Sequence, residues 1–591
     1  MDGNYIIGID LGTTNSVVAY KKRGSDSAIE LFQILQLTKE GHVEERKSLP
    51  SFLYIPGEHD LNKKQIALPW NKNMGYCSGE LARKQGNKVP GRMISSAKSW
   101  LSHQQVDREE KLLPFQGEEE LEKISPVEAS TRYLSHIKES WDHQFRKEKN
   151  AAFVDQEIYL TVPASFDAVA RELTVKAAKA AGIEATLLEE PQSAFYAWLY
   201  REGENWRNKL QVGDVVLVVD VGGGTSDFCL VAVEEQDGNL ELNRIAVGNH
   251  ILLGGDNIDL ALAHLISAKL PKAKLDPWQS LSLWYSCCEA KEALFSDPTL
   301  KKANVAILGR SSSLIGGTLK AKLTREELEN VAKNGFFPEV DIHNFSVQKH
   351  KVGLMQMGLP YATEPAITKH IAEFLQQNSN NQELIRPTAV LFNGGVFKAD
   401  VLQQQVTSVI NSWLPDAQVK TLNSHDLDTS VAIGAVYYGT TKHGEGIRIR
   451  GGVARSYYLG IETAMPAIPG VPPPLRGLCV IPSGMEEGSE SDVPGTELGL
   501  MIGEPVEFPF FSSNTRKEDL IGDDVDDLET LQSSSPLETT LSVKEGVKKG
   551  EMVPVKLHSK VTEVGTLEIS CRTTDNKHSW DLQFNVRKHD Q

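Results

Sequence analysis

Residues 220–227 read Asp220-Val221-Gly222-Gly223-Gly224-Thr225-Ser226-Asp227 and lie between two apolar runs, 215–219 and 228–231. Three glycines between hydrophobic runs predict a buried strand, a tight turn with open backbone amides, and a second strand. Such a turn can hold phosphate oxygens because no side chain blocks their approach. The carboxylates at its two ends cannot favour an anion directly, so they indicate a bound Mg²⁺ or a water that must be deprotonated. This combination points to a nucleoside triphosphate, although a plain hairpin shares the pattern.

The N-terminus repeats this unit. An apolar run at 5–9 leads into Asp10-Leu11-Gly12-Thr13-Thr14-Asn15-Ser16, and a second apolar run follows at 17–20. When Asp10 is placed on Asp220 and Gly12 on Gly222, the two stretches correspond as strand, aspartate, turn and returning strand. The chain therefore contains a duplication. We expect two similar lobes whose phosphate-binding turns face each other across a cleft.

Strands and helices alternate through the first 440 residues, which is typical of an α/β fold. Strands are expected at 5–9, 157–162, 185–188, 215–219 and 388–396, and helices at 126–148, 167–181, 258–269, 278–295, 399–413 and 427–438. Beyond a Gly-rich stretch at 443–452, apolar residues alternate with period two at 553–557, 567–571 and 580–586, which predicts antiparallel strands. We therefore predict an α/β nucleotide-binding domain of two lobes at 1–442, a linker at 443–453 and a β-sandwich at 454–591.

Composition narrows the class of protein. The chain has 591 residues and a formal charge of −17, which argues against nucleic acid or an anionic membrane surface as the main partner. The six cysteines have no zinc-like spacing and are expected to be reduced thiols. Neither an N-terminal signal nor an apolar run of the ~20 residues that a membrane span requires is present, so we expect a soluble, cytoplasmic protein.

Several motifs together resemble those of the seventy-kilodalton heat-shock chaperone family (heat shock protein 70). They are residues 7–16, Thr161-Val162-Pro163-Ala164, Glu190-Pro191, residues 220–227 and Leu253-Gly254-Gly255. The resemblance covers residues 5 to about 440 with specific motifs, and the rest only faintly, through residues 458–462. It implies an actin-like (ribonuclease-H-like) duplicated ATPase domain joined by a linker to a β-sandwich that holds extended peptides.

The resemblance also implies roles at the phosphate end of the site. Gly12, Thr13 and Thr14 of the first turn and Gly222, Gly223, Gly224 and Thr225 of the second would contact phosphates of ATP or ADP, close to the Gly254-Gly255 turn. Asp10, Glu190 and Asp220 would hold Mg²⁺, mostly through water. Asp227 would orient or deprotonate the attacking water, and Lys98 would steady the γ-phosphate.

At the nucleoside end, the resemblance places Gly394 and Gly395 beside the adenosine, Lys291 at the ribose and Asp428 at the far wall. Here the chain departs from the family pattern. Cys288 stands where the family has a Glu and Phe295 where it has a Ser, while Glu292 and Lys398 replace an Arg pair that flanks adenine. The adenosine contacts are therefore expected to be weaker than in the family.

Two other departures concern the use of the site. The linker reads Ile447-Arg448-Ile449-Arg450 in place of the family's apolar and acidic segment, so its docking onto the ATPase domain does not follow from the resemblance. The helical lid of the family has no counterpart in the sequence, so peptide binding is expected to be weak or directed at a special partner. The partners implied are an unfolded or specific protein client, a co-chaperone and a nucleotide-exchange factor.

Two other functions stay open. A small-molecule kinase on the same duplicated fold also has paired Asp-Gly-Gly turns, and the C-terminal β region and Lys98 argue against it. A scaffold that binds nucleotide without hydrolysing it would keep the turns and lack turnover. The leading hypothesis is an ATP-hydrolysing, chaperone-like protein whose nucleotide state acts on the β region.

Overall fold

Two six-stranded sheets in the first three quarters of the molecule share the arrangement of five of their strands and differ in the sixth. In each, a central strand pairs antiparallel with the next strand and parallel with a later one. The first sheet contains β1 (Tyr5–Leu11), β2 (Asn15–Lys22), β3 (Glu30–Leu31), β6 (Ser48–Pro50), β10 (Glu157–Val162) and β11 (Thr186–Glu189). The second contains β12 (Val215–Val221), β13 (Ser226–Gln236), β14 (Asn239–Val247), β17 (Ala389–Asn393), β18 (Lys420–Leu422) and β19 (Ile449–Arg450). The duplication expected from the sequence is thus present in the strand order.

The computed structural model describes residues 3–582 apart from 59, 104–105, 116, 118–120, 237–238, 271–274, 308–318, 349–358, 379–383, 415–416, 425, 445, 448, 451, 454, 464–473, 487, 496, 504, 541–542, 545–547, 563–565 and 576. Arg448 of the linker and the end of the last alternating run, after Leu582, lie outside these residues.

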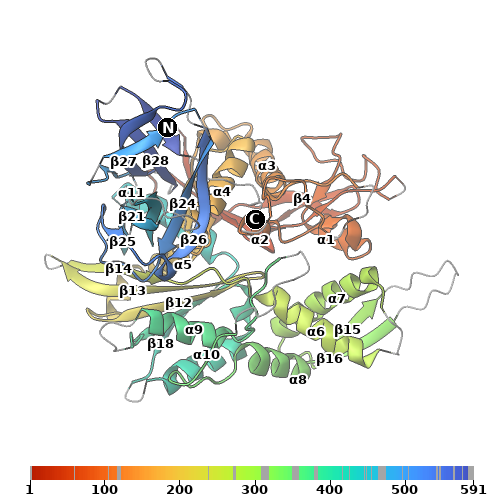
Figure 1. Cartoon of the computed structure of the whole chain (residues 1–591). Coiled ribbons are helices and arrows are strands. Elements are labelled where there is room, and N and C mark those ends of the chain that lie inside the picture. Colours follow the sequence, from red (N-terminus) through yellow and green to blue (C-terminus); the bar gives the residue numbers. More distant parts are fainter. Residues whose placement is uncertain are drawn as a thin grey trace.

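Helices cover the large sheets and lie between them (Figure 1). They are α1 (Glu80–Gly86), α2 (Ala97–Leu101), α3 (Pro126–Phe145), α4 (Ala168–Ala180), α5 (Glu190–Glu202), α6 (Gly255–Lys269), α7 (Pro277–Ser296), α8 (Arg325–Asn330), α9 (Ile367–Gln377), α10 (Asp400–Ser412) and α11 (Ser430–Lys442). Capping follows the sequence: the Asp167 carboxylate accepts from Ala170 N–H, and Gly182 after α4 has φ +74°. Helix α5 begins at Glu190, with Pro191 in its first turn. Among the described helices, none is long and apolar enough to cross a membrane.

Smaller sheets extend the two lobes. They comprise β4 (Ile34–Lys39) with β5 (His42–Arg46); β7 (Leu53–Tyr54), β8 (Cys77–Ser78) and β9 (Met93–Ile94); and β15 (Lys302–Ile307) with β16 (Leu319–Thr324). In Figure 1, α1 and β4 belong to one lobe, and α6, α7, β15 and β16 belong to the other.

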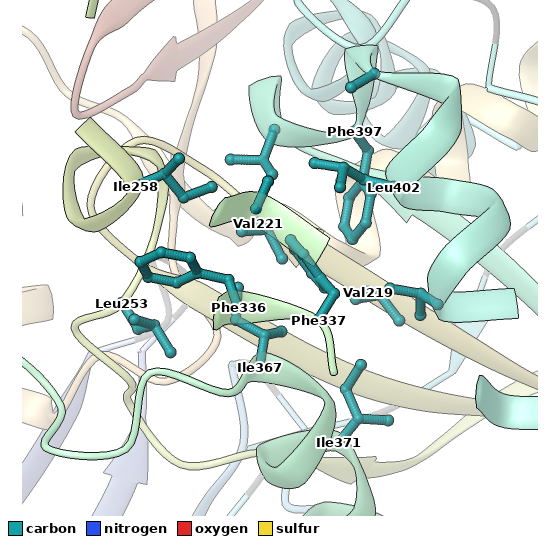
Figure 2. Close-up of a cluster of buried hydrophobic side chains, with 14 of the residues drawn as sticks. Val219, Val221, Leu253, Ile258, Phe336, Phe337, Ile367, Ile371, Phe397 and Leu402 are labelled. Atoms are coloured by element: carbon teal, nitrogen blue, oxygen red, sulfur yellow. The ribbon is translucent and has the colours of Figure 1, made fainter. Parts of the chain in front are cut away.

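The apolar run of β12 is buried on both faces, so its alternate residues join two different cores. Val219 and Val221 pack with Ile258 of α6, Ile371 of α9 and Leu402 of α10 (Figure 2). The opposite face of β12 joins a core that it shares with the first sheet and with α5 and α11. The strand is therefore held rigidly up to the turn that follows it.

The C-terminal strands form two five-stranded sheets. One contains β20 (Ser456–Glu462), β21 (Leu475–Ile481), β24 (Pro505–Ser513), β25 (Asp524–Val525) and β26 (Gln532–Thr540). The other contains β22 (Glu490–Asp492), β23 (Leu498–Met501), β27 (Met552–Val561), β28 (Leu567–Thr573) and β29 (Ser579–Leu582). Their inward residues, including Leu459, Phe510, Leu557 and Trp580, share one core. The molecule is thus a mixed α/β protein with several sheets.

The linker docks on the second large sheet. Ile449 and Arg450 form β19, which pairs in parallel with Leu242 and Asn243 at the edge of β14. Ile449 N–H also donates to the hydroxyl of Tyr196 at 2.9 Å. This docking did not follow from the sequence. It combines backbone pairing at the edge of β14 with burial of the Ile449 side chain in the core between the two large sheets.

Candidate active site

Strand alternation places Asp10 and Asp220 on the facing sides of the two large sheets. Ile6 of β1 and Val218 of β12 both join the core that lies between these sheets. Asp10 and Asp220 lie an even number of residues further along the same strands, so their side chains point to the same side. Each carboxylate therefore stands at the carboxyl end of a buried strand and faces the other lobe.

The two glycine turns touch each other. An added Cβ on Gly223 would lie only 2.1 Å from Thr14 Oγ1, so a residue with a side chain would push the turns apart. The carbonyls of Gly222 and Gly223 accept from the first N–H groups of α6, those of Gly255 and Asp256, at 3.0 and 2.7 Å. Because a trans peptide points its N–H opposite to its C=O, the amides after these carbonyls point away from α6. The turn thus offers N–H donors, as a phosphate cradle requires.

Gly254 makes this packing possible. A Cβ there would lie 2.7 Å from the carbonyl oxygens of both Gly222 and Gly223. At Gly394, after β17, φ is +88° and a Cβ would lie 2.2 Å from the carbonyl oxygen of Val221. Both glycines are therefore required by close approach of backbone to the second turn.

A cavity of about 300 Å³ opens between the two turns and collects most of the residues singled out from the sequence. Sixteen of them line it: Asp10, Gly12, Thr13, Thr14, Lys98, Glu190, Asp220, Gly222, Gly223, Thr225, Gly255, Lys291, Gly394, Gly395, Lys398 and Asp428. Gly224, Gly254 and Asp227 are not part of its wall. Cys288, Glu292 and Phe295 line it as well, at the positions where the chain departs from the family. Cys288 is a free thiol on α7 whose neighbour Cys287 is fully buried in the helix packing.

The phosphate end of the cavity carries a large excess of negative charge. Burial, followed by the charge of Glu190, raises the pKa of Asp10 to about 7. The same two causes raise the pKa of Asp220 well above its usual value. Burial alone would lower the pKa of Lys98, but the charges of Glu190 and Asp10 outweigh it and keep the ammonium protonated. Lys98 is buried, not an exposed helix lysine, and forms an ion pair with Glu190.

Asp220 has a fixed orientation that the sequence did not reveal. Asn393, the last residue of β17, donates from Nδ2 to Asp220 Oδ2 at 2.7 Å. The hydroxyl of Ser430 donates to Asn393 Oδ1 at 2.6 Å, which holds the amide in this direction. Asn393 directly precedes Gly394 and Gly395, so its place at a strand end was the only signal available.

Asp227 is the second residue of β13, the strand that leaves the second turn. It is opposite Asp220 in the pairing of β12 with β13, and only 3% of it is exposed. Its Oδ1 accepts from both the hydroxyl and the backbone N–H of Ser165, the latter at 3.3 Å. Burial raises the pKa of Asp227, while the hydrogen bonds from Ser165 oppose this. Because directly opposite residues of an antiparallel pair point to the same face, Asp227 lies on the same side of the sheet as Asp220, and its charge acts on Lys98 and Glu190.

The nucleoside end of the cavity is built from ion pairs between distant segments. Lys291 Nζ lies 2.9 Å from the Asp259 carboxylate, and Lys398 Nζ lies 2.6 Å from Asp428. Arg83 of α1 donates to Glu292 of α7 at 2.7 Å, so this pair joins the two lobes across the cavity mouth. Sequence reasoning found Lys291, Lys398 and Asp428 but missed Arg83 and Asp259, whose roles depend on contacts far along the chain.

The donor set fits hydrated Mg²⁺. In the part of the chain that the structure describes, no three His, Cys, Asp or Glu side chains are grouped to bind a metal ion directly. Asp10, Glu190 and Asp220 nevertheless face one space with Lys98 as a counter-charge. Burial is the largest cause that raises the pKa of each of the three carboxylates. Mg²⁺ usually keeps several waters and needs few direct carboxylate contacts.

A family model described as "Hsp70 protein" matches residues 6–422. The chain belongs to the Hsp70 family. It is 28% identical over 340 residues to a chaperone protein HscA homolog of Vibrio atlanticus, an alignment that covers 55% of this chain and 46% of the relative. It is 23% identical over 427 residues to the chaperone protein DnaK of Carsonella ruddii, covering 68% and 64%. An HscA homolog of Pseudomonas fluorescens is 28% identical over 407 residues, covering 67% and 57%.

These alignments span 46 to 64% of the relatives' own lengths. Hsp70 chaperones are ATPases that bind ATP or ADP with Mg²⁺. The residue roles and the use of the activity in this chain are taken up below.

Proposed function

We propose that this chain is an ATP-hydrolysing, chaperone-like protein in which the nucleotide state of residues 1–442 is coupled through the linker at 443–453 to the β region at 454–591. The observation that carries the proposal is the meeting of the two glycine turns above Asp10, Asp220, Glu190 and Lys98 in one cavity. Two amide-rich turns and a cluster of carboxylates suit a polyphosphate with a divalent cation.

In this proposal the triphosphate of ATP lies between the turns, with N–H groups at Gly12–Thr14 and Gly223–Thr225 as donors. Asp10, Glu190 and Asp220 hold the waters around Mg²⁺, which neutralises phosphate charge when bound. Asp227 takes the proton of the attacking water, the bond from the γ-phosphorus to the bridging oxygen breaks, and ADP and phosphate are formed. Because phosphoryl transfer needs little covalent help, positioning and charge supply most of the rate.

Lys98 has a double role in this scheme. Its ammonium pairs with Glu190, so it neutralises one of the clustered carboxylates. When a γ-phosphate enters, the ammonium would be shared between Glu190 and the phosphate. The buried setting strengthens this contact, because charges interact more strongly where water is excluded.

Contacts between the β region and the first 442 residues support the coupling. Arg455 donates to the carbonyl of Gly248 at 3.2 Å, and Lys517 Nζ donates to Asn378 Oδ1 at 2.8 Å. Arg244 of β14 joins the carbonyl of Gly452 to Glu189, the residue before Glu190. The linker is therefore connected, through one arginine, to the segment that carries a site carboxylate. Protein clients, co-chaperones and exchange factors are the partners that this proposal implies.

The test is phosphate release by the purified full chain with Mg²⁺ and ATP. Asp10→Asn or Asp220→Asn should each lower turnover by roughly tens of fold, given the charge that each contributes near the metal. Asp526→Asn, at an exposed position of the β region, is the matched control and should leave turnover unchanged. Unchanged turnover in both site variants would remove the site assignment.

Turnover that depends on an added sugar or acid acceptor would favour a kinase. Mg-ATP binding without phosphate release above an Asp227→Asn control would favour a scaffold.

A further inference from the structure

A chain of hydrogen bonds runs from Asp227 through Ser165 and His250 to a second cavity. Asp227 Oδ1 accepts from the hydroxyl of Ser165. Ser165 Oγ lies 2.7 Å from His250 Nδ1, and His250 Nε2 lies 2.8 Å from Ser102 Oγ. The three partners come from three different segments, and the sequence singled out none of them. Both ring nitrogens of His250 are thus engaged, and one of them contacts the residue that holds Asp227.

The direction of these hydrogen bonds matters for Asp227. A serine hydroxyl has a single proton and rotates freely, so Ser165 can donate either to Asp227 or to His250. If His250 carries its proton on Nδ1, that N–H donates to Ser165 Oγ and the Ser165 proton must point to Asp227. With the proton on Nε2, Ser165 would donate to the ring instead, and Asp227 would lose this hydroxyl donor. An ionised carboxylate favours the Nδ1–H form, in which the Ser102 hydroxyl donates to His250 Nε2 instead of to the Ser99 carbonyl 2.9 Å away.

The surroundings keep His250 neutral, as this arrangement requires. Burial lowers its pKa to about 4, Asp167 opposes this, and Arg455, Arg108 and Lys98 add to it. The ring packs edge to face against Phe166 at 5.7 Å between centroids. Its position is thus fixed by packing as well as by its two hydrogen bonds.

We propose that His250 is a positioning residue for the hydrolytic reaction: through Ser165 it aims the carboxylate of Asp227 at the attacking water. This inference rests on the proposed function, because it gives Asp227 the role of base. His250 itself touches neither nucleotide nor metal. Its effect should therefore fall on kcat and leave nucleotide binding intact.

The second cavity allows the proposal to be tested by rescue with free imidazole. Its volume is about 380 Å³, and Ser102, His250, Phe374 and Gln377 are among the residues that line it. Removing the ring of His250 would join this space to the hole that the ring leaves beside Ser165. Free imidazole is small enough to enter and to restore a donor to Ser165 Oγ.

The experiment compares the wild-type full chain with Ser165→Ala, His250→Ala and Gln377→Ala, measuring kcat, KM for Mg-ATP and nucleotide affinity with and without added imidazole. His250→Ala and Ser165→Ala should each lower kcat roughly tenfold or more, as misorientation of a catalytic group does, with KM within about twofold. Imidazole should restore most of the turnover of His250→Ala and none of that of Ser165→Ala. Gln377→Ala, an exposed residue of the same cavity, should behave as wild type.

The double variant separates a shared path from two separate effects. If His250 acts only through Ser165, Ser165→Ala with His250→Ala should turn over no more slowly than Ser165→Ala alone. Full activity of His250→Ala overturns the proposal. So does a loss of turnover that is matched by lost nucleotide affinity and not rescued by imidazole, because that is the result of a merely structural histidine. Absence of turnover in the wild type would instead overturn the proposed function itself, and the inference with it.

Discussion

Lys98 and Glu190 form an ion pair inside the cavity, with 9% and 12% of their side chains exposed. The two residues come from different elements, since Lys98 lies in α2 and Glu190 begins α5. Removing one member of a buried pair leaves the other charge uncompensated, which costs far more than the pair contributes. Replacing either residue should therefore change the charge of the site and also lower the stability of the first lobe.

Replacing Lys98 should affect both catalysis and the empty protein. We expect Lys98→Ala to lower Mg-ATP turnover by roughly tens of fold, since a cation near the transferred phosphoryl group is lost. Without nucleotide, the variant should also unfold at a lower temperature, because Glu190, Asp10 and Asp220 then repel one another unscreened. Phosphate release and thermal unfolding measure the two effects.

The matched control is Lys176→Ala, which breaks the surface pair with Glu109, where the lysine side chain is 58% exposed. Surface pairs contribute about 0–1 kcal/mol, so this variant should resemble wild type in both assays. Equal turnover of Lys98→Ala and wild type would show that Lys98 balances charge without assisting hydrolysis.

Asp256 should make the nucleotide-free protein less stable at high pH. Burial, then the charge of Asp259, raises its pKa from 3.8 to about 7. A folded-state pKa above the unfolded value means that the folded form binds more protons, so the contribution to stability is full below about pH 4 and is lost as the pH rises through 7. At about 1.4 kcal/mol per pKa unit, the loss is of the order of a few kcal/mol.

We therefore expect Asp256→Asn to raise the Tm of the nucleotide-free protein by several degrees at pH 8 and hardly at all near pH 4. Thermal unfolding without Mg²⁺ at a series of pH values measures this. Asp526→Asn, exposed in the β region, should show no pH-dependent gain. A Tm difference for Asp256→Asn that stays constant from pH 4 to 8 would contradict the raised pKa.

Arg83 and Glu292 should slow the release of bound nucleotide. Their side chains meet at 2.7 Å across the mouth of the cavity, and they belong to α1 and α7 of different lobes. Opening the lobes requires this pair to separate. Because the arginine side chain is 22% and the glutamate side chain 44% exposed, solvent screens the pair and its effect is modest.

We expect Arg83→Ala and Glu292→Ala each to speed the dissociation of a fluorescent ADP analogue by a few fold, and the double variant to dissociate no faster than the single ones. Arg207→Ala, whose pair with Glu204 lies on the surface, is the control. Independent, multiplying effects of the two substitutions would show that the ion pair is not what holds the lobes together.

The sequence predicted those parts of the site that depend on local backbone. Asp10 and Asp220 follow apolar runs, and a carboxylate at a strand end next to a glycine turn can be recognised from a dozen residues. The strands expected at 215–219 and 388–396 and the helices expected at 126–148 and 167–181 agree with β12, β17, α3 and α4 to within a few residues.

The parts that the sequence did not predict are contacts between distant segments. Asn393 orients Asp220 from 173 residues away, and Arg83 meets Glu292 across 209 residues. Asn393 meets Asp220 because β17 pairs with β12, and Arg83 meets Glu292 because two lobes face each other. The His250 and Ser165 pair is of the same kind. Local periodicity carries no information about which side chains will meet.

The docked linker should respond to nucleotide. β19 extends the sheet whose β12–β13 turn would hold the phosphates, so a shift of that sheet on binding changes the edge on which Ile449 and Arg450 pair. Tryptic cleavage at Arg450 requires this edge to open, and its rate follows the population of the opened form. We expect the cleavage rate to differ several-fold between ATP and ADP.

Tyr196→Phe removes the hydroxyl that accepts from Ile449 N–H at 2.9 Å, a bond of about 1 kcal/mol, and should speed cleavage in every nucleotide state. Equal cleavage of the wild type with ATP, with ADP and without nucleotide would refute the coupling, even if Tyr196→Phe behaves as expected.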